Sequence, residues 1–243
     1  EFEYIFLDEA ERKRFALFDH EYLITQHKQR DTSSHYALSD NSKELNIIGI
    51  KNPVKYLVVV PKRSDAVKIN QHSNYTSWLY DNIPPYSYDY TNAEMFYDPT
   101  AGADAQYGYI FYNNGAPAGK TQKSEANFTA TYFRKNLIEK MRIKFNGMNR
   151  TQENDHMFYQ KQQPLQYFKK KPKDGIYLYS FSVDPKNDQP SGACNFSHME
   201  SVSFDCTFNQ PPSSSYYTIN VNFYFVNYNI LKITSGMGGL VFS

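Results

Sequence analysis

The stretch DGIYLYSFSVDPKNDQPSGACNFSHMES (Asp174–Ser201) has the pattern of one strand followed by two turns. Its first half is rich in aromatic and β-branched residues, which favour a pleated, half-buried surface. Asp184-Pro185 should end the strand, because proline has no amide hydrogen to donate to a strand ladder. Pro190-Ser191-Gly192 should make a second tight reversal, in which glycine is free to adopt a positive φ.

Strand patterns also lie on both sides of this stretch. In EKMRIKFNG (Glu139–Gly147), apolar and basic residues alternate, which predicts a strand with one buried face and an Asn-Gly turn at its end. In YYTINVNFYFVNYNILKI (Tyr216–Ile233), every second residue from Ile219 to Phe225 is apolar and shares one face. Further strands are predicted for Glu1–Asp8, Glu21–Gln29, Leu45–Ile50, Lys55–Val60, Ser201–Phe208 and a short run after the C-terminal glycines.

Other segments interrupt these strands. Asp8–Ala16 (DEAERKRFA) predicts a short helix with Asp8 as its N-cap. Arg30–Glu44 is polar and predicts a loop, and Pro53 should separate two neighbouring apolar runs into a pair of strands. From Pro61 to about Asn127 the chain is rich in Asn, Ser, Tyr, Gly and Pro, which predicts a long surface insertion with short local structure.

The insertion contains NNGAPAGKT (Asn113–Thr121), which has some features of a phosphate-binding loop. That loop needs four residues between its first glycine and Gly-Lys-Thr, but only three separate Gly115 from Gly119. Pro117 also removes one of the amide donors that would hold phosphate. We therefore expect no nucleotide binding here.

About eight strands at this spacing, with little helix, predict an all-β domain. The pattern is compatible with a sandwich and with a jelly roll, and it does not choose between them.

The composition excludes several classes of function. A formal net charge of +1 gives no electrostatic case for binding nucleic acid. The basic run YFKKKPKD (Tyr167–Asp174) is the local exception: it suits a solvated loop, and its lysines could also meet phosphate or an acidic partner. The 22 tyrosines and 18 phenylalanines suit a β-protein with extensive packing partners.

The sequence predicts no catalytic, metal or cofactor site, and so no enzyme. The cysteines, Cys194 and Cys206, are expected to be small buried thiols rather than a disulfide. The histidines are scattered and form none of the usual metal-binding spacings; they are His20, His27, His35, His72, His156 and His198.

Several short motifs together resemble the major capsid proteins of nucleocytoplasmic large DNA viruses. A signature near the C-terminus of that family is matched by Tyr179-Ser180-Phe181, Asp184-Pro185, Gln189-Pro190-Ser191-Gly192 and Asn195-Phe196-Ser197. The segments YIFLDEAERKRFALFDHEYLITQ, NPVKYLVVV, FNGMNR and VNYNILKITSGMGGLVFS are similar to the family as well. In the last of these, Gly236, Gly238 and Gly239 should permit close backbone approach before the final strand. These residues determine the fold, and none is a nucleophile, general base or metal ligand.

The resemblance implies a double jelly roll, of which this chain is the C-terminal, eight-stranded antiparallel barrel within a longer polypeptide. Residues 1–8 would be the last strand of the preceding barrel, 9–20 a linker helix, and 21–243 the second barrel, with a surface insertion at about 61–127. Three copies would form a pseudo-hexagonal capsomer of an icosahedral shell assembled in the host cytoplasm. The partners would be the other copies, neighbouring capsomers, minor capsid proteins and, indirectly, an internal membrane.

A carbohydrate-binding jelly roll is the alternative hypothesis, because YDNIPPYSYDY (Tyr80–Tyr90) could supply exposed aromatics with Asp and Asn ligands. Separately, sequons mark Asn74, Asn127 and Asn149 as candidate glycosylation sites, of which Asn74 has the most favourable context. A fourth sequon, at Asn195, lies inside the signature and is the poorest candidate.

Overall fold

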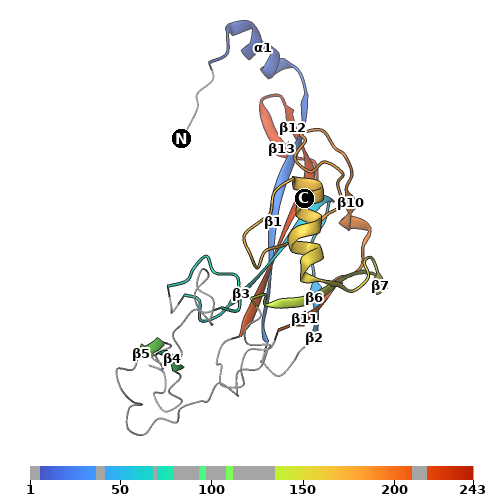
Figure 1. Ribbon diagram of the computed structural model, residues 1–243. Coiled ribbons are helices and arrows are strands. Elements are labelled where there is room, and N and C mark those ends of the chain that lie inside the picture. The colour runs from blue at the N-terminus through green and yellow to red at the C-terminus, as the bar shows by residue number, and fades with distance from the viewer. Residues whose placement is uncertain are drawn as a thin grey trace.

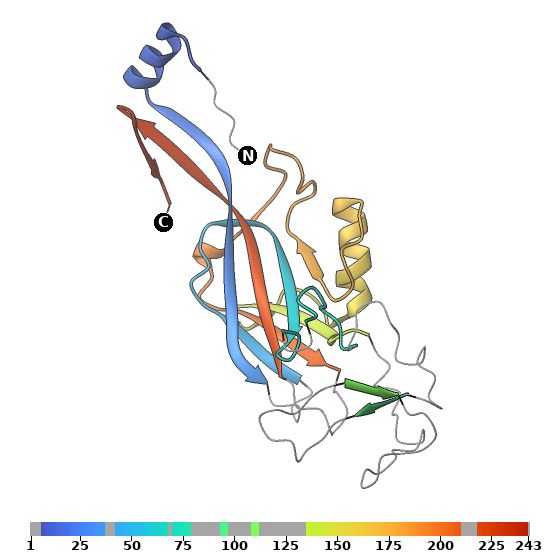
Figure 2. The same ribbon diagram turned by 90° about the vertical axis from the view of Figure 1, so that its left-hand side faces the viewer.

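The computed structural model describes residues 6–36, 42–67, 70–78, 93–96, 108–111, 135–209 and 218–242. In this part of the chain, two antiparallel sheets pack face to face around one core (Figures 1 and 2). The six-stranded sheet contains β1 (His20–Tyr36), β12 (Ile219–Thr234), β3 (Pro53–Arg63) and β10 (Cys194–Asn195) in that order, with β13 (Met237–Leu240) on β12 and β9 (Tyr177–Ser180) on β3. The five-stranded sheet contains β2 (Ser42–Ile47), β11 (Val202–Phe208), β6 (Ile138–Phe145) and β7 (Met148–Asn149), with β8 (Asn154–Asp155) on β6.

The core is formed by alternate residues of the facing strands. The predicted apolar face of β12 is confirmed, because every second residue from Ile219 to Phe225 is buried. The predicted face of β6 is confirmed as well: Met141 and Ile143 are fully buried and Phe145 packs against the core. The rings of Phe204 and Phe223, from opposite sheets, lie 4.6 Å apart at their centroids.

The Asn-Gly turn predicted after β6 is also confirmed. Asn146 and Gly147 both have positive φ angles, 50° and 76°, as the tight two-residue turn of a β-hairpin requires. The turn joins β6 to β7, whose residues pair back with the end of β6.

Two strands differ in length from the sequence-based prediction. β1 continues to Tyr36 through residues predicted as a polar loop, because its backbone pairs with β12 as far as Thr32, opposite Val221, and again at Tyr36, opposite Ile219, after an irregularity in the register. Polar side chains do not prevent this, since the ladder uses only main-chain groups. β9 is shorter than predicted and ends at Ser180, where its pairing with β3 stops.

β3 also extends further than predicted. It runs through Pro61 to Arg63, so the expected insertion begins after the strand rather than at Pro61. Pro61 lies opposite Val221 at a level that β9 does not reach, so one edge of β3 is unpaired there and a missing amide is tolerated.

The first part of the predicted insertion packs on the two facing sheets, which together are called the barrel below. The Arg63 guanidinium forms a buried ion pair with Asp65 at 2.6 Å and donates to the carbonyl oxygen of Ser77 at 2.7 Å. Ala66 and Thr76 are buried, so residues 64–67 and 70–78 are not a solvated loop. Of the rest, β4 (Ala93–Phe96) and β5 (Gly108–Phe111) pair with each other, and the remaining positions lie outside the described residues.

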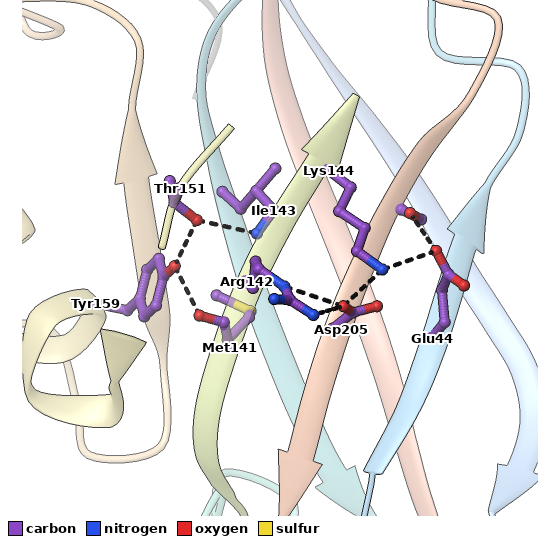
Figure 3. A network of polar contacts seen from close by, with 9 residues as sticks. Glu44, Met141, Arg142, Ile143, Lys144, Thr151, Tyr159 and Asp205 are labelled. Atoms are coloured by element: carbon purple, nitrogen blue, oxygen red, sulfur yellow. Dashed lines mark hydrogen bonds and ion pairs between the residues drawn. The ribbon is translucent and has the colours of Figure 1, made fainter. Parts of the chain in front are cut away.

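A helix that the sequence analysis did not predict closes one side of the barrel. It consists of two consecutive π-helical segments, η4 (Phe158–Gln162) and η5 (Pro164–Phe168). The Tyr159 hydroxyl donates to the carbonyl oxygen of Met141 in β6 at 3.0 Å (Figure 3). The Gln163 side chain accepts from the Ser180 amide of β9 at 3.2 Å. One helix therefore contacts strands of both sheets, and it satisfies a backbone amide of β9, which lies at an edge of the six-stranded sheet in the described part of the chain.

Tyr177 of β9 joins the two sheets beside this helix. Its hydroxyl accepts from the amide of Ile138 and donates to the carbonyl oxygen of the same residue, at 3.1 and 2.9 Å. Burial raises the pKa of Tyr177 and of Tyr159, so both phenols stay protonated and remain donors.

Charged side chains form a network on the outer face of the five-stranded sheet. The Asp205 carboxylate lies 2.5 Å from Arg142 and 2.7 Å from Lys144, and Glu44 lies 3.7 Å from Lys144 (Figure 3). Burial alone would raise the pKa of Asp205, but hydrogen bonds from Lys144 and Arg142 hold it below its ordinary value.

Replacing Asp205 with asparagine should lower the melting temperature at neutral pH, because Arg142 and Lys144 would lose the carboxylate between them. A lowered carboxyl pKa stabilises the fold above its ordinary value, about pH 4, and the contribution disappears as the pH falls below it. Thermal melting at several pH values should therefore show the two proteins converging in acid. Glu153→Gln is the control, since Glu153 lies 3.7 Å from Lys140 in a pair that is about half exposed; an equal effect of both changes would contradict this account.

Candidate functional site

The long strands of the six-stranded sheet extend beyond the barrel as a projecting arm. β3 pairs with β12 only as far as Asn227, and beyond it β12 pairs with β1 and β13 alone. Figures 1 and 2 show β1, β12 and β13 reaching beyond the other strands of the two sheets, with α1 (Glu9–Leu17) at their end. We call residues 6–24 and 229–242 the arm.

The helix of the arm forms for local reasons. Asp8 accepts a hydrogen bond from the amide of Glu11 at 2.7 Å, which confirms the predicted N-cap. None of the residues of α1 is buried, so packing against the barrel does not hold it. The strand predicted for Glu1–Asp8 falls mostly outside the described residues, and its last three residues, from Phe6, are not in a strand.

Hydrogen bonds from Asn229 fix the shape of the arm. Its side-chain amide donates to Gln26 of β1 at 2.9 Å and to the carbonyl oxygen of Phe242 at 2.6 Å. Its side-chain oxygen accepts from the amide of Phe242 at 3.2 Å. β1, β12 and the segment after β13 are thus tied together through one buried side chain.

The arm exposes a large amount of apolar surface. Phe6 is 93% exposed, Leu17 77% and Met237 75%. Seven further apolar residues of the arm are between 38% and 61% exposed: Phe15, Phe18, Tyr22, Leu23, Leu240, Val241 and Phe242. Contiguous apolar surface of this kind marks a site of interaction with protein or membrane.

The signature residues lie elsewhere, over the end of the barrel, and they organise one connection. The Ser191 hydroxyl accepts from the amide of Asp184 and donates to its carbonyl oxygen, both at 2.8 Å. Gly192 has a φ of 133°, and a Cβ atom there would lie 3.0 Å from the carbonyl oxygen of Phe181. The Lys55 ammonium donates to the carbonyl oxygen of Asn187 at 3.1 Å, which holds the connection against β3.

The aromatic members of the signature enter the core beside this connection. Phe181 lies between Tyr179 and Phe196, with ring centroids 5.1 and 5.7 Å away. Asn195 caps the short helix η6 (Phe196–His198), since its side chain accepts from the amide of Ser197 at 3.0 Å. Pro185 is buried, Ser180 donates to the carbonyl oxygen of Ser182, and Gln189 and Pro190 are exposed. These contacts are structural and bring together no group that could carry out catalysis.

Comparison with known proteins identifies the family. The model of the family described as "Large eukaryotic DNA virus major capsid protein" matches residues 11–239. The chain belongs to this major capsid protein family. Members of this kind are structural components of the virion rather than enzymes.

Individual relatives agree with the family match. The chain is 28% identical to the major capsid protein of Phaeocystis pouchetii virus over 277 aligned positions, which cover 99% of the chain and 52% of the relative. It is also 28% identical to the major capsid protein of Paramecium bursaria Chlorella virus 1, with 99% of the chain and 53% of the relative covered. The chain thus spans about half the length of these two relatives.

Solved structures share the fold. A quasi-atomic model of the PBCV-1 virus capsid matches with a TM-score of 0.64 and 26% identity, covering 99% of this chain and 55% of that chain. The Faustovirus major capsid protein matches with a TM-score of 0.51 at 13% identity, a similarity that concerns the fold alone.

The prediction that the C-terminal glycines, Gly236, Gly238 and Gly239, permit close backbone approach is wrong. Gly236 has a φ of 76° and forms the turn before β13 together with Ser235, whose φ is 52°. Close backbone approach is not the reason for Gly238 and Gly239, because a Cβ atom at Gly238 would make only ordinary contacts and one at Gly239 would meet open space.

Asn74, the best of the predicted glycosylation candidates, is buried in the structure. Asn74 is 3% exposed, its amide donates to the carbonyl oxygen of Trp78, and its oxygen accepts from the amide and hydroxyl of Thr76. A side chain held in this way is not accessible for modification. Asn149 is exposed on β7, and Asn127 lies outside the described residues.

The remaining sequence-based expectations can be placed briefly. Cys194 and Cys206 are free thiols; Cys206 is buried, as predicted, whereas Cys194 is only half-buried. Burial raises the pKa of both. Among the described residues, no group of three His, Cys, Asp or Glu side chains could hold a metal ion. Over the same residues, no helix is long and apolar enough to cross a bilayer. The phosphate-loop look-alike Asn113–Thr121 and the whole of the candidate carbohydrate patch Tyr80–Tyr90 lie outside the described residues.

Proposed function

We propose that this chain is the second, C-terminal jelly roll of a double jelly-roll capsid subunit. Three such subunits would form a pseudo-hexagonal capsomer of an icosahedral shell around a large DNA virus. The exposed apolar arm carries the proposal, because it requires a partner that the described part of the chain does not supply.

The order of strand pairing supports an eight-stranded jelly roll. In such a roll an antiparallel ribbon is folded over, so the first strand pairs with the last, the second with the seventh, and so on inward. Taking β1, β2, β3, β6, β8, β9, β11 and β12 as the eight strands, the pairs are β1 with β12, β2 with β11, β3 with β9 and β6 with β8. All four pairs follow the rule for a jelly roll.

The preceding half of the subunit is the proposed occupant of the arm. The relatives have room for it, because the chain covers only 52% and 53% of their lengths. The arm carries the N-terminal helix, so a segment before Phe6 would emerge beside the exposed apolar residues. A barrel connected there could cover them without a long linker. In this proposal residues 1–8 belong to that barrel and residues 9–20 connect the two.

The insertion is proposed to face outward, near the three-fold axis of the capsomer. Its first residue follows Arg63, which pairs with Ile219 at the end of β12 opposite the arm. If the arm and the preceding barrel occupy one end, the insertion is free to extend from the other. Neighbouring capsomers and minor capsid proteins would contact the sides of the barrel, and assembly would take place in the host cytoplasm.

Negative charge introduced into the arm should weaken assembly of the subunit without unfolding the C-terminal barrel. In the subunit that includes the preceding half, Leu17→Asp with Met237→Asp should loosen the contact between the arm and that half, because two carboxylates would be buried there without a partner. Since a capsomer needs both halves held in place, the trimer fraction should fall by about tenfold or more. Native mass spectrometry measures this fraction. Ile48→Asp is the matched control, because Ile48 is 84% exposed but lies outside the arm.

The arm variant should keep the melting temperature of the C-terminal barrel, because both residues project from it. A variant that still forms trimers like the parent protein would count against the arm as the place where the two halves of the subunit meet. A parent protein that is monomeric at every concentration would refute the trimeric capsomer itself.

A further inference from the structure

Six lysines gather on one side of the barrel, away from the arm. The basic run supplies Lys169, Lys170, Lys171 and Lys173 after the end of η5. The fold adds Lys135, which precedes β6, and Lys186, from the connection after β9. We call these six residues the lysine surface.

Specific contacts join these lysines into one surface. Asp174 lies 2.8 Å from Lys135 and 2.6 Å from Lys171, so one carboxylate is shared by two ammonium groups. Lys186 donates to the carbonyl oxygen of Phe168, which places it beside the start of the basic run. Lys173 donates to the carbonyl oxygen of Ser73 at 2.7 Å.

Local structure explains only part of this gathering of charge. The negative end of the helix favours a cation nearby, and Lys186 occupies that place. Lys169 and Lys170 are exposed and form no ion pair among the residues described. The nearest carboxylates in sequence are Asp174 and, on either side of Lys186, Asp184 and Asp188. Like charges held together without counter-charges repel one another, so a partner of opposite charge would relieve the repulsion.

The chemistry of the surface favours carboxylates over nucleic acid. All six cations are lysines, which act as mobile point charges and lack the fork with which arginine grips phosphate. Single-stranded nucleic acid also needs exposed aromatic rings for stacking. The rings next to the run, Tyr167 and Phe168, are half-buried, and Phe168 packs edge-on against Tyr56 at 5.0 Å.

We propose that the lysine surface binds an acidic segment, rich in Asp and Glu, of another protein. The surface already holds one carboxylate, because hydrogen bonds from Lys135 and Lys171 lower the pKa of Asp174 to about 2. The surface lies outside the arm, so this inference does not depend on the proposed capsomer. A neighbouring subunit or a separate protein could supply the segment.

The test measures binding of a fluorescent oligoglutamate to the chain by anisotropy. Lys169→Glu with Lys170→Glu should weaken binding by about tenfold or more, because each change turns an attraction into a repulsion. Lys169→Gln with Lys170→Gln should weaken it less, which separates lost attraction from misfolding. The control, Lys51→Glu with Lys140→Glu, makes the same change of charge on two exposed cations outside both the lysine surface and the arm and should stay within about twofold.

Three results would overturn the proposal. The first is no binding of oligoglutamate to the parent chain at low salt. The second is an equal loss in the surface variant and in the control, which would indicate attraction to overall charge alone. The third is binding to vesicles containing phosphatidylserine, or to polyphosphate, without binding to oligoglutamate, which would assign the surface to phosphate instead.

Discussion

Replacing Tyr159 with alanine should destabilise the barrel by about 3–5 kcal/mol, the usual cost of removing a buried aromatic side chain. Tyr159 is fully buried, and its hydroxyl is the link from the helix to Met141 in β6. The same hydroxyl lies 3.2 Å from Thr151, whose oxygen accepts from the amide of Ile143 at 3.0 Å (Figure 3). Losing the ring therefore opens a cavity and also removes this donor from the carbonyl oxygen of Met141.

Two further variants separate these effects in chemical denaturation. Tyr159→Phe keeps the ring and loses only the hydrogen bonds, so it should cost about 1–2 kcal/mol. Leu165→Ala, on the same helix but 54% exposed, should change the free energy of unfolding by no more than about 0.5 kcal/mol. If Tyr159→Ala is no worse than Leu165→Ala, the helix does not close the barrel.

Replacing Gly175 with alanine should cost about 3 kcal/mol or more, because two penalties coincide at this position. Its φ is 87°, a conformation that residues with a side chain rarely adopt. A Cβ atom would also lie 2.0 Å from the carbonyl oxygen of Tyr75, which is backbone and cannot move aside cheaply. The substitution should therefore push residues 70–78 off the start of β9.

Two other glycines act as controls for the two penalties. Gly147 has a similar φ of 76° but open space around it, so Gly147→Ala should show the conformational cost alone, about 1 kcal/mol. Gly239 has open space and no positive φ, so Gly239→Ala should be nearly neutral. Equal melting temperatures for the Gly175 and Gly147 variants would show that the contact with Tyr75 is not important.

Strong local patterns made most strands predictable. The alternation in β6 and β12 and the Asn-Gly turn are decided by neighbouring residues, so the sequence alone reveals them. The polar end of β1 and the part of β3 after Pro61 depend instead on pairing with β12, which is distant in sequence. The helix was missed because its inward face carries Gln160 and Gln163 as well as Tyr159, so no apolar stripe marks it.

The site was less predictable than the fold. Asn74 has a solvent-exposed context in sequence, yet folding surrounds it with Thr76 and Trp78. The arm has no motif of its own, because Leu17 and Met237 become neighbours of other exposed residues only when β1 and β12 extend together. Likewise, Lys186 joins the basic run only through its contact with Phe168.

The most direct test of the capsid proposal is an electron cryo-microscopy reconstruction of the virion shell. The account predicts three copies of this barrel in each capsomer, with Leu17 and Met237 buried against a second jelly roll of the same polypeptide. A shell in which the arm faces solvent, or in which this barrel stands without a second one attached, would contradict it.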